Sequence, residues 1–179
     1  MVLDPLVVLT ARYALGGVFA VSATAKFLKL QDFVGIVANY RVLPGWAVRP
    51  VAMAIPPMEA LLAVGFISRV WLDAVCGIAW VLLAVFTAAI VINLVRGRTE
   101  IDCGCLGPLL RQRIGWWMVV RNAVLMGIVG LVHPVWISAG RTYGLADVVF
   151  GGLAALVLLI LYGAFQLLWT QTPREVSSR

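Results

Sequence analysis

Charged residues are scarce in this sequence, and their scarcity indicates its class. Asp, Glu, Lys and Arg together make up 12% of the 179 residues, whereas an average soluble domain is about 25% charged. Hydrophobic residues make up 63%, and the mean hydropathy is +1.01. So much apolar surface needs lipid to cover it. The composition therefore excludes an ordinary soluble domain and predicts an integral membrane protein.

Metal-ligating residues are also few. The chain has one histidine, His133, and three cysteines. A zinc site usually takes four protein ligands, and His133 is predicted on the opposite side of the membrane from Cys103 and Cys105, so no metal site is predicted within one chain. An iron–sulfur cluster shared between two chains stays open as an alternative. Three cysteines are too few for a disulfide scaffold, and at most one intramolecular pair can form at a time.

A basic leader is missing as well. The chain opens with Asp4 and Pro5 in place of a basic segment, and no small-residue cleavage site follows, so the first apolar run is predicted to remain as a mature helix. The net charge of +6 comes from Lys and Arg residues that lie between apolar runs, which favours membrane topology over nucleic-acid binding. Because the composition does not shift along the chain, residues 1–179 are predicted to form a single transmembrane domain.

Apolar runs long enough to cross a bilayer recur along the chain. A spanning helix needs about 20 apolar residues, and a protein that spans lipid with such runs is predicted to be all-α. The second and fourth runs are short, so five spans are predicted, with four as the fallback. Pro56 and Pro57 remove backbone donors from the second run and are predicted to disturb it. The five runs are residues 6–25, 51–67, 74–95, 116–132 and 145–169.

A shorter amphipathic segment follows the first run. Residues 27–41 carry apolar side chains at near-helical spacing, which predicts an interfacial helix that lies on the membrane. The sequence Leu43-Pro44-Gly45 is predicted to end it, because proline and glycine break helices.

The positive charges are distributed unevenly over the connections. Two of them, Arg69 and Arg141, fall on one side of the predicted bundle. Because Lys and Arg favour cytoplasmic loops, the N-terminus is predicted outside and the C-terminus in the cytoplasm of a multi-pass protein of the cytoplasmic membrane. The ten that fall on the other side are Lys26, Lys29, Arg41, Arg49, Arg96, Arg98, Arg111, Arg113, Arg174 and Arg179.

Two cysteines with one residue between them lie in the connection between the third and fourth runs, residues 96–114. Three glycines and a proline deny this connection a regular helix. Gly104 lets Cys103 and Cys105 approach the tight geometry of a disulfide over one residue, and a strained disulfide is readily reduced. Redox exchange is therefore the favoured interpretation, against two thiols that are close by coincidence. Cys76 lies near the opposite end of the third run and is interpreted as a packing residue.

Polar side chains inside the predicted spans form a second candidate site, which comprises Lys26, Glu59, Arg121 and Asn122. Glu59 falls in the middle of the second span, where a carboxylate is costly unless it is paired. Arg121 and Arg12 are its candidate partners, whereas Lys26 is expected to extend to the interface. A structural ion pair and a functional role, in proton coupling or in contact with a quinone or thiol substrate, both remain open.

Two amide side chains are positioned to form hydrogen bonds near the cysteine connection. Asn93 stands at the inner end of the third span, and Asn122 stands beside Arg121. Polar side chains of this kind form hydrogen bonds between membrane helices at modest energies. A structural use is therefore favoured for both.

The residues also carry a family resemblance over about residues 6–165. A loose pattern of glycines, prolines and polar residues in the helices resembles the DoxX-like superfamily. The run from Asp102 to Gly107, with Arg121-Asn122 after it, is similar to the MauE branch of that superfamily. The loose pattern is Gly16-Gly17, Ser22-Ala23, Lys26-Phe27, Phe33, Tyr40, Leu43-Pro44, Pro56, Glu59 and Gly65.

The resemblance implies a small helical bundle linked to thiol redox reactions. MauE proteins act with a thioredoxin-like partner, MauD, in maturing the disulfide-rich small subunit of methylamine dehydrogenase. Carried over, Cys103 and Cys105 are the exchanging pair, and Lys26, Glu59 and Arg121 match positions of unassigned role. That partner works outside the cytoplasmic membrane, whereas the charge count predicts the cysteine connection inside.

Three functions are compatible with these features. The favoured one is a membrane thiol-disulfide oxidoreductase, for which the membrane setting makes a quinone the candidate second redox partner. A non-catalytic membrane anchor or assembly subunit of a redox complex is the first alternative. A small-solute transporter that uses Glu59 is the second, and the lack of an internal repeat weakens it.

Overall fold

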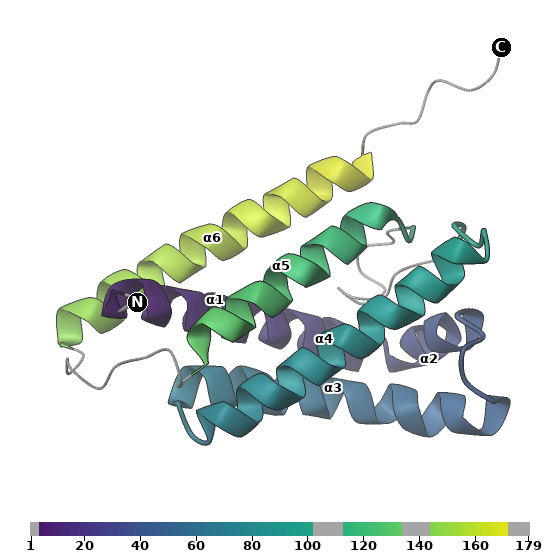
Figure 1. The fold of residues 1–179 in the computed structure, drawn as a ribbon, viewed down its shortest axis with the longest axis horizontal. Helices are drawn as coiled ribbons and strands as arrows, with labels where there is room; N and C mark the ends of the chain where they lie inside the picture. The colour runs from purple at the N-terminus through teal and green to yellow at the C-terminus, as the bar shows by residue number, and fades with distance from the viewer. Residues whose placement is uncertain (1–3, 102–112, 134–143, 172–179) are drawn as a thin grey trace, which may run out of the picture.

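The computed structural model describes residues 4–101, 113–133 and 144–171, and the described part of the chain is built from helices. The chain is thus an all-α membrane protein, as its composition predicts. Figure 1 shows the arrangement of the helices. The six described helices are α1 (Pro5–Leu28), α2 (Leu30–Asn39), α3 (Gly45–Ser68), α4 (Leu72–Val95), α5 (Trp116–Val132) and α6 (Leu145–Gln171).

Each of the five predicted spans coincides with a helix. Four of these helices, α1, α3, α4 and α6, are long and apolar enough to cross a membrane. The fifth, α5, is apolar but has 17 residues, which gives it a length of about 26 Å at 1.5 Å per residue. The five helices alternate in direction, so the start of α1 and the end of α6 lie at opposite ends of the bundle (Figure 1).

Helix α3, which contains the second predicted span, is longer than that span and is unbroken. It begins at Gly45, where Pro44 occupies the N-cap position, and it continues through Pro50, Pro56 and Pro57. Each proline removes one backbone donor, but neighbouring helices and side chains can satisfy the freed carbonyls of a membrane helix. The predicted disturbance at Pro56 and Pro57 therefore does not interrupt α3.

The amphipathic segment forms a shorter helix than predicted and packs against the bundle. Lys29, with φ −134° and ψ 52°, separates α1 from α2, and α2 has ten residues. Phe33 and Ile36 are buried, and Phe33 lies in a cluster with Ala52 and Ile55 of α3. The apolar face of α2 therefore packs, at least in part, against α3.

The largest apolar cluster lies between α1, α3, α4 and α5. The rings of Phe19 and Phe66 stack there with their centroids 5.9 Å apart. Cys76, which is 2% exposed, belongs to the same cluster. Its predicted role as a packing residue agrees with this position.

Small residues allow two pairs of helices to approach closely. A Cβ atom at Gly17 of α1 would collide with Leu159 of α6, and a Cβ atom at Gly65 of α3 would collide with Val75 of α4. Helices in membranes associate largely through such close packing at small residues. Both glycines belong to the loose family pattern. Close helix packing alone explains why glycine occupies these two positions.

Candidate functional site

A buried ion pair joins α1 to α3. The ammonium Nζ of Lys26 lies 2.7 Å from Oε1 and 2.8 Å from Oε2 of Glu59. The two side chains are 1% and 2% exposed. This pair corrects two predictions: Lys26 does not extend to the interface, and an ion-pair partner of Glu59 is Lys26, which was not among its candidate partners.

Ser22 completes the immediate surroundings of this pair. It precedes Lys26 by four residues, so the two side chains project from the same face of α1. Its hydroxyl Oγ donates a hydrogen bond to Glu59 Oε1 at 3.1 Å and accepts one from Lys26 Nζ. Buried ion pairs persist when hydrogen bonds satisfy both charged groups, and Ser22 supplies such bonds to both.

Two aromatic rings flank the ammonium group. Lys26 Nζ lies 5.3 Å from the ring centroid of Phe33 on α2 and 5.8 Å from that of Phe86 on α4. Both distances are within the range of a cation–π attraction. The ammonium is thus stabilised by a carboxylate, a hydroxyl and two ring faces drawn from four helices.

A second polar group connects α5 to α4. The guanidinium of Arg121 donates from Nε and Nη2 to Asn122 Oδ1, at 3.3 and 3.1 Å. The amide Nδ2 of Asn122 in turn donates to Thr87 Oγ1 at 3.1 Å, and Thr87 donates to the carbonyl oxygen of Leu83 at 2.7 Å. The expected structural use of Asn122 therefore has specific partners.

Residues of the ion-pair group and of the Arg121–Asn122 group line the same small cavity of about 40 Å³. A water molecule needs roughly 10–15 Å³ of such volume, so the cavity is large enough for water. Three of the four residues of the predicted intramembrane site line it, and Lys26 adjoins it through Glu59. Its polar lining residues are Ser22, Glu59, Arg121, Asn122 and Tyr162.

Arg12, the other predicted partner of Glu59, binds elsewhere. Its Nε and Nη2 donate to the carbonyl oxygen of Phe66 at 3.2 and 2.8 Å, and Nη2 also donates to that of Ile67 at 3.3 Å. A cation at a helix C-terminus satisfies unpaired carbonyls and favours the helix dipole. Arg12, which is 1% exposed, is therefore a buried cap for α3.

Cys103 and Cys105 lie outside the described residues, but the chain on either side of them is described. The backbone N–H of Ile114 donates to the carbonyl oxygen of Ile101 at 2.9 Å. Arg113 Nη1 also lies 2.9 Å from Glu100 Oε2, so one of the acidic residues near the cysteines has a cationic partner. These contacts hold residues 100–101 and 113–114 side by side, and these are the two ends of residues 102–112, here called the cysteine segment.

Further contacts attach both ends to the bundle. Ile101 and Ile114 are buried in a cluster with Ile90 of α4 and Met118 of α5. Asn93 accepts a hydrogen bond from Arg98 Nη1 at 3.2 Å, which is the predicted contact of this amide near the cysteine connection. The cysteine segment thus leaves and rejoins the bundle at one fixed place.

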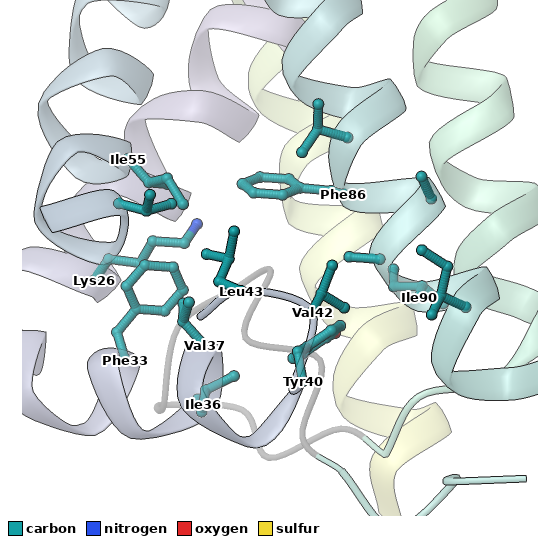
Figure 2. Close-up of a pocket in the computed structure, with 15 residues that line it drawn as sticks. Lys26, Phe33, Ile36, Val37, Tyr40, Val42, Leu43, Ile55, Phe86 and Ile90 are labelled. Carbon is teal, nitrogen blue, oxygen red and sulfur yellow. The ribbon is translucent and has the colours of Figure 1, made fainter. Parts of the chain in front are cut away.

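A larger apolar cavity of about 280 Å³ lies between α2, α3 and the second half of α4. Figure 2 shows Lys26 and the rings of Phe33 and Phe86 toward one end of it, and Tyr40 and Ile90 toward the other. Lys26 is the one charged residue among its described lining residues. The ion pair therefore lies between a small cavity with five polar lining residues and a larger apolar one.

Sequence reasoning gave Ser22, Thr87 and Phe86 no part in this site. Ser22 was detectable, because a serine four residues before a lysine shares its helix face. Thr87 and Phe86 were not, since they lie on α4 and meet the site only through helix packing. His133, which follows α5 at the end remote from the cysteine segment, lies 3.7 Å from Asp73 and takes no part.

Comparisons with known proteins give one consistent family. A sequence model described as "Methylamine utilisation protein MauE" matches residues 4–135. A methylamine utilization protein MauE of Paracoccus versutus is 40% identical over 175 residues, which cover 98% of this chain and 94% of the relative. The MauE protein of Paracoccus denitrificans is 37% identical, over 88% and 86% of the two chains. That of Methylorubrum extorquens is 36% identical, over 90% and 87%. No solved structure matches significantly.

Proposed function

The chain belongs to the MauE family of methylamine utilisation proteins, and on this premise we propose that it is a membrane thiol-disulfide redox protein. Cys103 and Cys105 are its exchanging pair, and a thioredoxin-like protein of the MauD type is its partner. The relatives are named for methylamine utilisation. We further propose that within this pathway the chain serves the maturation of a disulfide-rich enzyme such as methylamine dehydrogenase.

The anchoring of the cysteine segment is the observation that carries this proposal. Its two ends are joined by the Ile114–Ile101 hydrogen bond and buried against α4 and α5. A reactive dithiol needs a backbone free enough to close a strained disulfide, yet it must meet its partner at a reproducible place. Gly104 and Gly107, in a sequence between fixed ends, meet both requirements.

The exchange proceeds through a mixed disulfide. A thiolate of one cysteine attacks the partner's disulfide, which forms a new intermolecular S–S bond and releases a partner thiolate. The second cysteine then attacks that intermolecular bond, which leaves a Cys103–Cys105 disulfide here and a dithiol on the partner. Electrons flow in the opposite direction when the partner dithiol attacks first. The intramembrane polar site of Lys26, Glu59, Arg121 and Asn122 fixes the helices that present the segment.

Trapping of the mixed disulfide tests this step. A variant with one cysteine of the pair replaced by serine can form the intermolecular bond but cannot resolve it. We therefore expect either Cys103→Ser or Cys105→Ser to accumulate a covalent complex with a thioredoxin-like protein, detected as a reducible band on a non-reducing gel. The variant that accumulates it retains the attacking cysteine.

The matched control is Cys76→Ser, which changes a thiol buried in the core and should give no complex. The native chain should give a faint band at most, because it resolves the intermediate. Absence of any complex from both single variants, with the partner co-expressed, would refute the exchange mechanism.

We propose that the N-terminus lies outside and that the C-terminus and the cysteine segment face the cytoplasm of the cytoplasmic membrane. The excess of Lys and Arg on that side supports this orientation. The alternating helices also place α2, the cysteine segment's ends and the end of α6 at one end of the bundle (Figure 1). A MauD-type partner that works outside can form a mixed disulfide with Cys103 or Cys105 only if the placement is the opposite one. The side on which the cysteines lie therefore also decides whether the partner is of that type.

Thiol labelling decides between these placements. In a Cys76→Ala background, a membrane-impermeant maleimide should label Cys103 and Cys105 in inverted vesicles after reduction, and leave them unlabelled in right-side-out vesicles. Oxidised samples should resist labelling from either side, because a disulfide has no free thiol. Labelling confined to right-side-out vesicles would reverse the proposed orientation and leave the exchange mechanism intact.

A further inference from the structure

The apolar cavity beside Lys26 is suited to a specific kind of ligand. We propose that it binds the head group of a membrane quinone, a neutral ring that carries two carbonyl oxygens and an apolar tail. Its volume of about 280 Å³ is near the lower end of the range for small-molecule sites, which is roughly 300–1,000 Å³. A ring of this type fits there, with its tail outside the cavity.

The cavity is open toward the membrane-facing surface. Val85, Ala88 and Ile92 line it and are also exposed on the surface of α4, at the spacing of one helix face. Val51 of α3 is likewise both lining and exposed. A surface this apolar on a spanning helix is in contact with lipid. A ligand therefore enters from the bilayer, as lipid-soluble quinones can.

The charge of the Lys26–Glu59 pair selects a neutral ligand. Glu59 neutralises Lys26, which is the one charged residue in the described lining of this cavity, so a fatty acid or another anion would add an unbalanced charge there. A carbonyl oxygen needs only a donor, and the ammonium supplies one when it keeps a single contact to Glu59 in place of two. The rings of Phe33 and Phe86 on either side of the ammonium (Figure 2) offer faces against which a flat ring packs.

The far end of the cavity adjoins the base of the cysteine segment. Tyr40 and Ile90 both line the cavity. Ile90 belongs to the cluster that holds Ile101 and Ile114, and Tyr40 packs against that cluster. This continuity suggests the quinone's purpose, which rests on the function proposed above. Closure of the cysteine dithiol to a disulfide releases two electrons and two protons, and a quinone that accepts all four becomes a quinol.

Binding of decylubiquinone, a short-tailed quinone, tests the site. The full-length protein is placed in nanodiscs of synthetic phosphatidylcholine, and equilibrium binding of the radiolabelled quinone is measured. Ala89→Phe fills the cavity and should weaken binding about tenfold or more, a change of about 1.4 kcal/mol. The matched control is Ala74→Phe, on the exposed surface of the same helix and away from the cavity lining, which should bind within about twofold of the native protein.

The outcomes separate this inference from the proposed function. Equal binding by the native and Ala89→Phe proteins, or displacement of the quinone by palmitate at equal concentration, would overturn the quinone site. The Cys103→Ser/Cys105→Ser protein should bind decylubiquinone like the native chain, because the site needs no thiol. Quinone binding without any trapped mixed disulfide would leave the site standing and remove the exchange function. Trapping without quinone binding would do the reverse.

Discussion

Replacing Lys26 with methionine is expected to destabilise the folded protein by about 3–5 kcal/mol, because Glu59 would remain buried without the cation that contacts both of its oxygens. Methionine preserves most of the apolar length of the side chain, so the loss is one of charge and hydrogen bonds. Unfolding of the purified protein in mixed micelles, followed by circular dichroism as the denaturing detergent is increased, measures the change.

Two further variants show whether the pair causes that loss. Lys26→Met/Glu59→Met removes both charges and should recover most of the stability, since apolar replacements of a buried ion pair are often neutral or stabilising. Lys29→Met, three residues away on an exposed connection, should leave stability nearly unchanged. A Lys26→Met protein as stable as the native one would mean that Arg121, which lines the same small cavity as Glu59, balances the carboxylate.

The pair also specifies the arrangement of the helices. Apolar side chains pack against one another in many registers, especially in lipid, where burial of apolar surface does not drive association. The ammonium of Lys26 meets Glu59, Ser22 and two rings only when α1, α2, α3 and α4 take one relative position. The same register places Tyr40 and Ile90 against the ends of the cysteine segment.

Helix positions were predictable because lipid restricts what can cross it. A spanning helix must be apolar for about 20 residues, and every run of that kind became a helix. The start of α3 was less accessible, since Pro50 and Arg49 interrupt the apolar run while the helix extends back to Gly45. Hydropathy identifies the residues that cross the hydrocarbon core, whereas backbone geometry determines where a helix begins.

The position of Lys26 was mispredicted for a physical reason. A lysine at the end of a span normally reaches water, but the chain turns at Lys29 and α2 folds back beside the bundle. Phe33 on α2 then covers the ammonium. The sequence of one span alone cannot predict the contact between Lys26 and Phe33, because the contact depends on how α2 packs against the bundle.

The apolar cavity was equally inaccessible to sequence reasoning. Helices α3 and α4 are joined by a tight turn that includes Arg69 and Trp71, both with positive φ, and they diverge toward the end where α2 lies (Figure 1). The space between them is lined by residues from the first half of α3 and the second half of α4. These residues are ordinary lipid-type side chains in the sequence, and only the divergence of the helices makes them a site.

Loss of both cysteines is expected to abolish function completely in cells. In a methylamine-utilising bacterium that lacks its own MauE protein, the native chain should restore growth on methylamine, and the Cys103→Ser/Cys105→Ser chain should not. The reason is stoichiometric: one disulfide exchanged with a partner needs two thiols, one to attack and one to resolve. The small subunit of methylamine dehydrogenase should then accumulate with unpaired thiols, measured by alkylation and mass spectrometry.

The single replacement Cys76→Ala is the matched control for that experiment. It removes a thiol from the core cluster, which should lower stability by about 1 kcal/mol and leave growth on methylamine intact. Equal membrane levels of all three proteins, checked by immunoblot, keep a folding defect from imitating a chemical one. Full growth with the double serine chain would favour the anchor or assembly subunit over the oxidoreductase, because a scaffold needs helix packing and ends such as Ile101 and Ile114 but no exchangeable thiol.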